Sequence, residues 1–236
     1  GHAAESRVPG FAAGLDRSIS QITPDRYRNP ADVPDGRVLV VGASATGVQL
    51  ADELRAAGRD VVLSVGRHTR VPRRYRGMDI MWWLDCIGAL DQVADPADGL
   101  RAPDRSLQLV GSDSGREVDL DALARRGIEL IGHIGKFDGS TCRVVDDLSA
   151  TRATADAKLH RLLQRIDDYA TASGLHSELE PASRPAPAQP VTRPTATRLK
   201  LGASGIGSVV WATGYRRRYP WLHLPVLDPR GEIAHV

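Results

Sequence analysis

The residues with the clearest chemical meaning form a glycine-rich pattern, Gly42-x-Ser44-x-x-Gly47. Gly42 can adopt a tight turn between a strand and a helix, and Ser44 is small enough for a phosphate to approach the backbone. Gly47 allows the helix to pack close to the strand, and the exposed amides at the start of such a helix attract anions. The pattern predicts a site for the pyrophosphate of a dinucleotide, formed by Gly42, Ala43, Ser44, Ala45, Thr46 and Gly47.

Two predicted elements must hold this turn in place. The run of apolar residues after Arg37 predicts a strand, and the pattern of apolar residues through Leu54 predicts an amphipathic helix. Gly58 stands where that helix should end. This context of strand, turn and helix makes the pattern more specific than the glycines alone. The alternative is a glycine turn that only packs.

The next predicted strand, Asp60 to Val65, indicates which dinucleotide is bound. Sites for NAD usually place a carboxylate at the end of this strand, but here it leads into Gly66-Arg67-His68-Thr69-Arg70. The guanidinium groups of Arg67 and Arg70, with His68 between them, match the oxygens of a 2′-phosphate. We therefore expect the cofactor to be NADPH. The alternative is a solvated basic loop, since further arginines follow at once: Arg73, Arg74 and Arg76.

The composition indicates one or two globular domains. The chain has 236 residues, a net charge of +2 and 42% hydrophobic residues, so it can bury a sizeable core. The near-neutral charge argues against a dedicated nucleic-acid binder, although the run from Arg67 to Arg76 is locally basic. No apolar stretch approaches the roughly 20 residues of a membrane span, and no signal-peptide core is present, so we expect a cytoplasmic protein. Cys86 and Cys142 are too few for a disulfide framework and are not spaced like metal ligands.

The middle of the chain predicts further helices and short strands. Met78 to Leu90 is apolar almost all round and predicts a buried or interface helix. Ala153 to Gly174 predicts an amphipathic helix, whose apolar face consists of Leu159, Leu162, Leu163, Ile166, Tyr169 and Ala170. The remaining predicted elements are a loop at 91–105, strands at 106–110 and 117–120 around a turn at 112–115, a helix at 119–126 that Gly127 ends, strands at 128–134 and 141–145, a proline-rich loop at 181–197, and strands at 198–201 and 208–212.

The order of these elements predicts an α/β fold. We expect a Rossmann-like three-layer NAD(P)-binding domain with a central, mainly parallel sheet and a small β extension. No residue is a clear catalytic acid, base or nucleophile, and no metal site is expected. Asp85 and His133 are polar residues in apolar settings, for which a hydrogen-bonded role in the core is the expected explanation.

Four features together resemble the flavin-containing monooxygenase class of flavoproteins, which bind two dinucleotides. They are the turn at 42–47, the basic end of the second strand at Arg67, the segment Val209-Val210-Trp211-Ala212-Thr213-Gly214-Tyr215, and their order along the chain. The resemblance implies an NADPH domain inserted into an FAD domain. It also implies that Thr213 and Gly214 border the nicotinamide end of the cofactor.

The resemblance leaves parts of the family pattern unmatched. The family begins with a strand and a Gly-x-Gly-x-x-Gly turn that hold FAD, and nothing before Arg37 has that form. We therefore expect residues 1–36 to be a crossover segment from a missing FAD domain, residues 37–215 to be the NADPH-binding domain, and residues 216–236 to begin the return to the FAD domain. FAD belongs to the parent family but is not expected to be held by this chain alone.

The leading hypothesis is the NADPH-binding portion of a flavin-dependent monooxygenase or related oxidoreductase that delivers hydride to a flavin. The isolated chain is not expected to turn over. The alternative is a non-enzymatic NADP(H)-binding module or sensor that acts through a protein partner, and exposed apolar surfaces would favour a homodimer or docking to an FAD domain. A short-chain dehydrogenase is disfavoured, because no Tyr-x-x-x-Lys pair occurs and Tyr169 is followed by Ser173.

Overall fold

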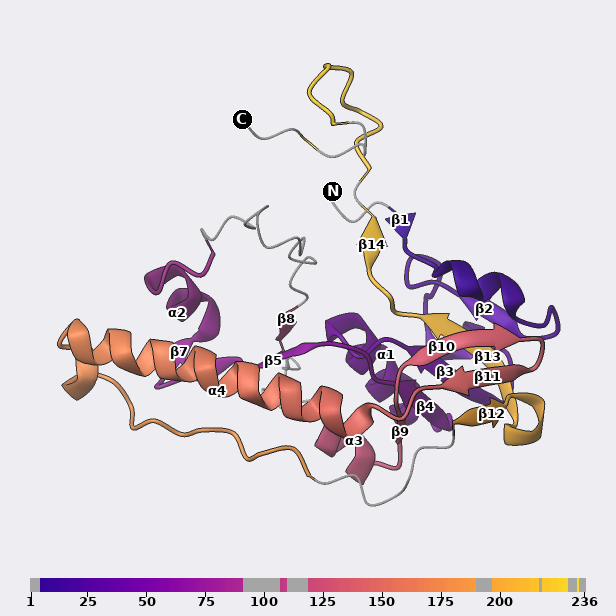
Figure 1. The fold of residues 1–236 in the computed structure, drawn as a ribbon, viewed down its shortest axis with the longest axis horizontal. Helices are drawn as coiled ribbons and strands as arrows, with labels where there is room; N and C mark the ends of the chain where they lie inside the picture. Colours follow the sequence, from indigo (N-terminus) through magenta and orange to yellow (C-terminus); the bar gives the residue numbers. More distant parts are fainter. Residues whose placement is uncertain are drawn as a thin grey trace.

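A five-stranded parallel sheet forms the centre of the fold (Figure 1). The computed structural model describes residues 5–90, 107–109, 119–189, 197–216, 218–228 and 233. The sheet has the strand order β2-β13-β3-β4-β9, and every neighbouring pair is parallel. Its strands are β2 (Ser20–Ile22), β3 (Arg37–Val41), β4 (Val61–Ser64), β9 (Glu129–Ile131) and β13 (Ile206–Trp211).

The two faces of this sheet are covered differently, which creates three layers. Alternate residues of a strand point to opposite faces, so Val38 and Val40 pack with the helices α1 (Ala45–Ala56) and α3 (Leu120–Arg125). Leu39 and Trp211 belong to the core on the other face. There the antiparallel sheet β10-β11-β12 and the short helix η1 (Gly10–Gly14) complete the third layer, with β10 at Ile134–Asp138, β11 at Thr141–Val144 and β12 at Arg198–Lys200. The predicted three-layer fold with a small β extension is confirmed.

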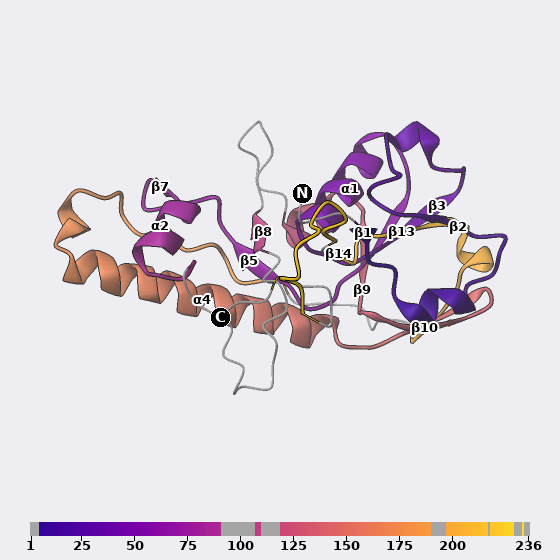
Figure 2. The same ribbon diagram turned by 90° about the horizontal axis from the view of Figure 1, so that it is seen from above.

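A long helix, α4 (Leu148–Ala172), projects from the three layers (Figures 1 and 2). Its inner face packs against α2 (Ile80–Cys86) and the strand β5 (Thr69–Val71), with Trp83 fully buried between them. The predicted apolar face of α4 is confirmed: four residues are buried and two are partly buried in this cluster. Short strands complete the region: β6 (Arg74–Tyr75) pairs with β7 (Met78–Asp79), and β8 (Leu107–Leu109) pairs with β5.

The chain returns along α4 in an extended form. After the turn η4 (Leu175–Ser177), residues 178–189, here called the return segment, contact α4 at several points (Figures 1 and 2). Arg184 pairs with Asp167 at 2.7 Å, and the amide of Ala188 donates to Asp156 at 2.7 Å. Prolines keep this segment from forming a helix, as the sequence predicts.

The remaining short elements lie near the ends of the described chain and at turns. The strand β1 (Glu5–Ser6) pairs with β14 (Tyr215–Arg216), and residues 218–228 extend beyond them (Figure 1). Short helical turns occur at η2 (Pro30–Asp32) and η5 (Gly202–Ser204). None of the helices in the described residues combines the length and hydropathy that a membrane span requires.

The structure differs from the predicted elements in five details. The strand predicted at 128–134 is two strands, because β9 ends at Ile131 and the chain enters the antiparallel sheet at Ile134. Between them Gly132 packs closely, since a Cβ there would lie 1.8 Å from the carbonyl oxygen of Val145. Leu120 begins α3 rather than ending a strand, since the carboxylate of Asp119 accepts from the amide of Ala122 and caps the helix. The helix predicted at 78–90 is shorter in the structure, where α2 spans Ile80–Cys86. α4 begins at Leu148, five residues before the predicted start, and the strand β2 was not predicted. The loop at 91–105, residues 117–118 and the turn at 112–115 lie outside the described residues.

Candidate dinucleotide-binding site

The turn between β3 and α1 requires glycine at two positions. Gly42 has a φ of 107°, and a Cβ at this residue would lie 2.3 Å from the carbonyl oxygen of Ala212. A Cβ at Gly47 would lie 1.8 Å from the carbonyl oxygen of Gly42 and 3.3 Å from the Cβ of Ala212. The amide of Gly42 also donates to the carbonyl of Ser64 at 3.0 Å. The turn is therefore held between the ends of β13 and β4, and neighbouring backbone leaves no room for a side chain at Gly42 or Gly47.

The first residues of α1 present the groups that an anion requires. Ser44 is the N-cap residue with an extended backbone, and its side chain makes no capping hydrogen bond. Ala43 is buried, whereas Ser44, Ala45 and Thr46 are partly exposed. The first amides of a helix have no acceptor within the helix and carry its partial positive charge. The geometry fits a phosphate group at this helix start.

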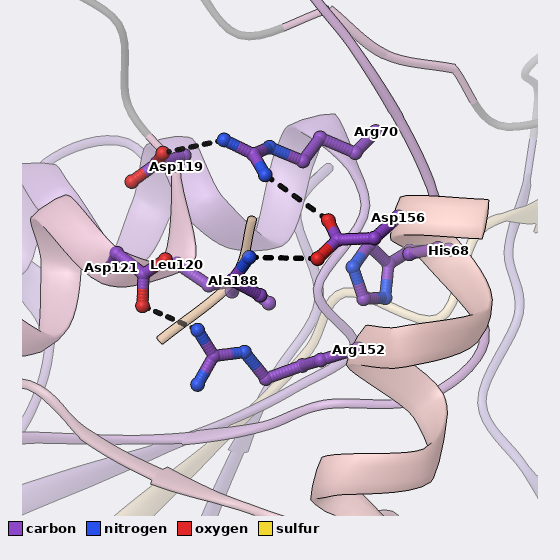
Figure 3. A pocket seen from close by; sticks show the side chains of 9 residues that line it. His68, Arg70, Asp119, Leu120, Asp121, Arg152, Asp156 and Ala188 are labelled. Carbon is purple, nitrogen blue, oxygen red and sulfur yellow. Dashed lines mark hydrogen bonds and ion pairs between the residues drawn. The ribbon is translucent and has the colours of Figure 1, made fainter. Parts of the chain in front are cut away.

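Arg67 and Arg70 lie in different surroundings after β4. Arg67 is exposed. Arg70 is largely enclosed, and its guanidinium pairs with Asp119, the N-cap of α3, and with Asp156 of α4, each at 3.1 Å (Figure 3). It also donates to the carbonyl of Ala186 in the return segment at 3.2 Å. The donors of Arg70 are thus engaged within the protein.

The surroundings of Arg70 form a network of charged residues (Figure 3). Arg152 pairs with Asp121, whose carboxylate also accepts from the amide of Gln189 at 3.2 Å. The carboxylates of Asp119, Asp121 and Asp156 thus face two guanidinium groups. The network therefore carries a net negative charge, which opposes the binding of a phosphate. The residues enclose a cavity of only about 10 Å³. The network therefore connects α3, α4 and the return segment by ion pairs and hydrogen bonds, and it is unsuited to bind a 2′-phosphate.

His68 is buried against this network. Its Nδ1 lies 3.0 Å from the carbonyl oxygen of Gly66. Burial lowers the pKa of His68, and the positive charges of Lys158 and Arg152 lower it further, against the opposing effect of Gly66. The ring is therefore neutral near pH 7 and supplies no positive charge to a ligand. Of the three residues predicted for the 2′-phosphate, the geometry favours Arg67.

The segment after β13 lies beside the glycine turn. Thr213 donates a hydrogen bond from its hydroxyl to the carbonyl of Arg7, and the amide of Arg7 donates to the carbonyl of Gly214 at 2.8 Å. Gly214 has a φ of 89°. Because Ala212 touches both glycines of the turn, the structure brings Thr213 and Gly214 to the same edge of the sheet as residues 42–47.

The two polar residues expected in the core are both exposed. Asp85 lies on the outer side of α2, and His133 lies between β9 and β10 with Nδ1 2.6 Å from the carboxylate of Asp147. The expectation of a buried role is wrong for each, because apolar neighbours in sequence do not share a face with them. Within the described part of the chain, no group of three or more His, Cys, Asp or Glu residues is arranged to hold a metal ion.

Comparison with known proteins supports the resemblance noted in the sequence. The chain is 25% identical over 230 residues to an uncharacterized CzcO-like oxidoreductase of Geobacillus kaustophilus, which covers 97% of this chain and 49% of the relative. It is 29% identical over 83 residues to an uncharacterized oxidoreductase CzcO of Bacillus subtilis, covering 35% of this chain and 24% of that protein. No protein-family model matches the chain.

The solved structures give the same picture for the fold. A mutant flavin monooxygenase from Stenotrophomonas maltophilia superposes with a TM-score of 0.50 at 13% sequence identity, covering 98% of this chain and 46% of the monooxygenase. The chain spans about half the length of the Geobacillus relative and of this monooxygenase. The expected resemblance is confirmed: the chain is similar in sequence to CzcO-like oxidoreductases and has the fold of about half of a flavin monooxygenase.

Proposed function

We propose that this chain forms the NADPH-binding portion of a flavin-dependent monooxygenase or related oxidoreductase. The observation that carries the proposal is the turn at 42–47, where Gly42 and Gly47 leave no room for a side chain and the start of α1 faces the edge of the sheet. In parallel α/β sheets, ligands bind at the carboxyl ends of the strands where the strand order reverses. That reversal lies between β3 and β13, beside this turn.

Three parts of the dinucleotide have a proposed contact. The turn at 42–47 holds the pyrophosphate through the first amides of α1, and the exposed guanidinium of Arg67 binds the 2′-phosphate. Thr213 and Gly214 border the nicotinamide, an assignment that comes from the family resemblance and fits their place beside the turn. Arg70 keeps its ion pairs and supports the loop that carries Arg67.

The chemistry belongs to the cofactors. Bound NADPH supplies a hydride, which the flavin of this family accepts. The residues of this chain bind and orient the nicotinamide dinucleotide. The described residues contain one unit of strand, glycine turn and helix, and this unit is assigned to NADPH, so we propose that FAD requires contacts outside it.

A second candidate is an NADP(H)-binding module that acts through a protein partner. It is favoured by the exposed apolar side chains of Met81 and Trp82 on α2, each 38% exposed. An absorbance spectrum and an NADPH consumption assay with added FAD test the module, which predicts neither a bound flavin nor NADPH consumption. Saturable consumption would refute the module and would also contradict our expectation that the chain alone does not turn over.

Calorimetric titration with NADPH and NADH tests the proposed site. The wild-type chain should bind NADPH more tightly, because a charge-assisted contact to phosphate contributes about 1.5–3 kcal/mol. The variant Arg67→Ala should lose about ten- to a hundredfold in NADPH affinity and keep its NADH affinity. Arg161→Ala, which removes an exposed arginine of α4, is the matched control and should change neither. Equal affinities of the wild type for both nucleotides would refute the 2′-phosphate assignment.

A further inference from the structure

His133 and Asp147 form an oriented pair that the proposed function does not yet use. His133 follows β9, and Asp147 is the residue before α4. The carboxylate of Asp147 accepts from Nδ1 of His133 at 2.6 Å and from its backbone amide at 3.1 Å. The hydroxyl of Thr151 donates to the same carboxylate at 3.2 Å. These contacts hold the imidazole ring in one orientation.

The contacts also define which ring nitrogen is free. Burial raises the pKa of Asp147, but the hydrogen bonds from His133 and Thr151 outweigh burial and lower it overall. An ionised carboxylate only accepts hydrogen bonds, so Nδ1 of His133 carries a hydrogen. In the neutral ring Nε2 is then left as an acceptor. The side chain of His133 is 48% exposed, so a ligand can reach the ring.

The strand order places the end of β9, which His133 follows, beside the end of β4, which Arg67 follows. β9 pairs with β4 so that Ile131 lies opposite Ser64, and the hydroxyl of Ser64 donates to the carbonyl of Gly132 at 3.1 Å. The ends of β3, β4 and β9 therefore follow one another along the edge at steps of about 4.8 Å. The pyrophosphate is assigned to the end of β3 and the 2′-phosphate to Arg67 after β4. Continuing outward, the adenine base reaches the end of β9, where His133 lies.

We propose that His133 recognises the adenine base of the dinucleotide. Its Nε2 accepts a hydrogen bond from the 6-amino group of adenine, and Asp147 is the positioning residue that holds the ring and its tautomer. This inference rests on the proposed function, because it requires that NADPH binds along this edge. It assigns a contact to the base, in addition to the contacts with the pyrophosphate and the 2′-phosphate.

The test compares NADPH with its hypoxanthine analogue, in which a carbonyl oxygen replaces the 6-amino group. The wild-type chain should bind NADPH about two- to tenfold more tightly, which is the effect of one neutral hydrogen bond. His133→Phe keeps an aromatic ring without the acceptor and should bind both nucleotides equally. Asp147→Ala should lose the same preference. His223→Ala, which removes an exposed histidine beyond β14, is the control and should retain it.

The outcomes distinguish this inference from the proposed function. A preference that persists in His133→Phe, or a wild type that binds both nucleotides equally, overturns the adenine contact and leaves NADPH binding intact. If Asp147→Ala binds both nucleotides more weakly but keeps the preference, Asp147 does not position the ring. If the wild type binds neither nucleotide, the proposed function fails together with this inference.

Discussion

Replacing Gly47 with alanine should damage both the stability of the chain and its NADPH binding. Alanine adds one methyl group, and its Cβ would lie 1.8 Å from the carbonyl oxygen and 2.8 Å from the carbonyl carbon of Gly42. These are backbone atoms of the turn, so they cannot move aside as a flexible side chain would. Either α1 shifts away from β3 or the turn distorts, and both movements change the proposed pyrophosphate site.

The size of the effect follows from the packing. Overpacking a close contact costs typically 1–3 kcal/mol, and we expect the upper part of this range because the clash is with backbone. For a chain of this size, each kcal/mol shifts the melting temperature by about 2–4 °C. Gly47→Ala should therefore lower the melting temperature by about 4–12 °C.

Thermal unfolding followed by circular dichroism measures this change, and calorimetric titration of the folded variant measures NADPH binding. Gly202→Ala is the matched control, because a Cβ at Gly202 meets nothing within 4 Å. The control should melt and bind like the wild type. If Gly47→Ala melts within about 1 °C of the wild type and binds NADPH normally, the close approach between α1 and β3 does not limit this position.

Three further predictions concern charged and buried groups. Arg70→Ala leaves two carboxylates without their partner and should cost about 1–3 kcal/mol in thermal unfolding, with the preference for NADPH unchanged; loss of the preference would assign Arg70 to the ligand. Burial raises the pKa of Asp167, but hydrogen bonds, led by that from Arg76, outweigh burial and lower this pKa overall. The ionised carboxylate therefore stabilises the fold fully above about pH 4. This stabilisation is lost as the pH falls through the lowered pKa of Asp167 in the folded chain. Asp167→Asn should thus lower the melting temperature at pH 7 and less so in acid, and a pH-independent difference would contradict this. Burial raises the pKa of the Cys142 thiol to about 12, so a thiol reagent should label Cys86 first in the native chain; equal labelling rates would show that Cys142 is accessible.

Local signals in the sequence were sufficient to predict most of the fold. Positive-φ glycines follow α1, α3 and α4, at Gly58, Gly127 and Gly174, where the sequence predicts the helix ends. The period of apolar residues likewise predicts which face of α4 is buried. The break between β9 and β10 at residues 132–133 was not predicted, because the apolar residues Ile128, Leu130, Ile131 and Ile134 indicate one continuous strand. β2 is only three residues long and includes polar Ser and Gln, so it has no strand pattern of its own.

The candidate site was predicted less completely, for a physical reason. The turn at 42–47 is defined by neighbouring residues, and its glycines are recognisable in sequence. The environment of Arg70 depends on Asp119 and Asp156, which lie 49 and 86 residues away along the chain. The pairing of His133 with Asp147 likewise depends on the passage of the chain from β9 into the antiparallel sheet. Such long-range contacts decide which charged groups are free for a ligand, and only the folded structure shows them.

The central claim is that NADPH binds at the carboxyl edge of the parallel sheet, and an NMR titration tests its location most directly. In ¹H–¹⁵N spectra of the chain, NADPH should shift the amides of residues 42–47, of Arg67 and of residues 213–214. NADH should shift the first and last groups but have a smaller effect at Arg67. Shifts confined to other regions, or no shifts at saturating NADPH, would contradict the account.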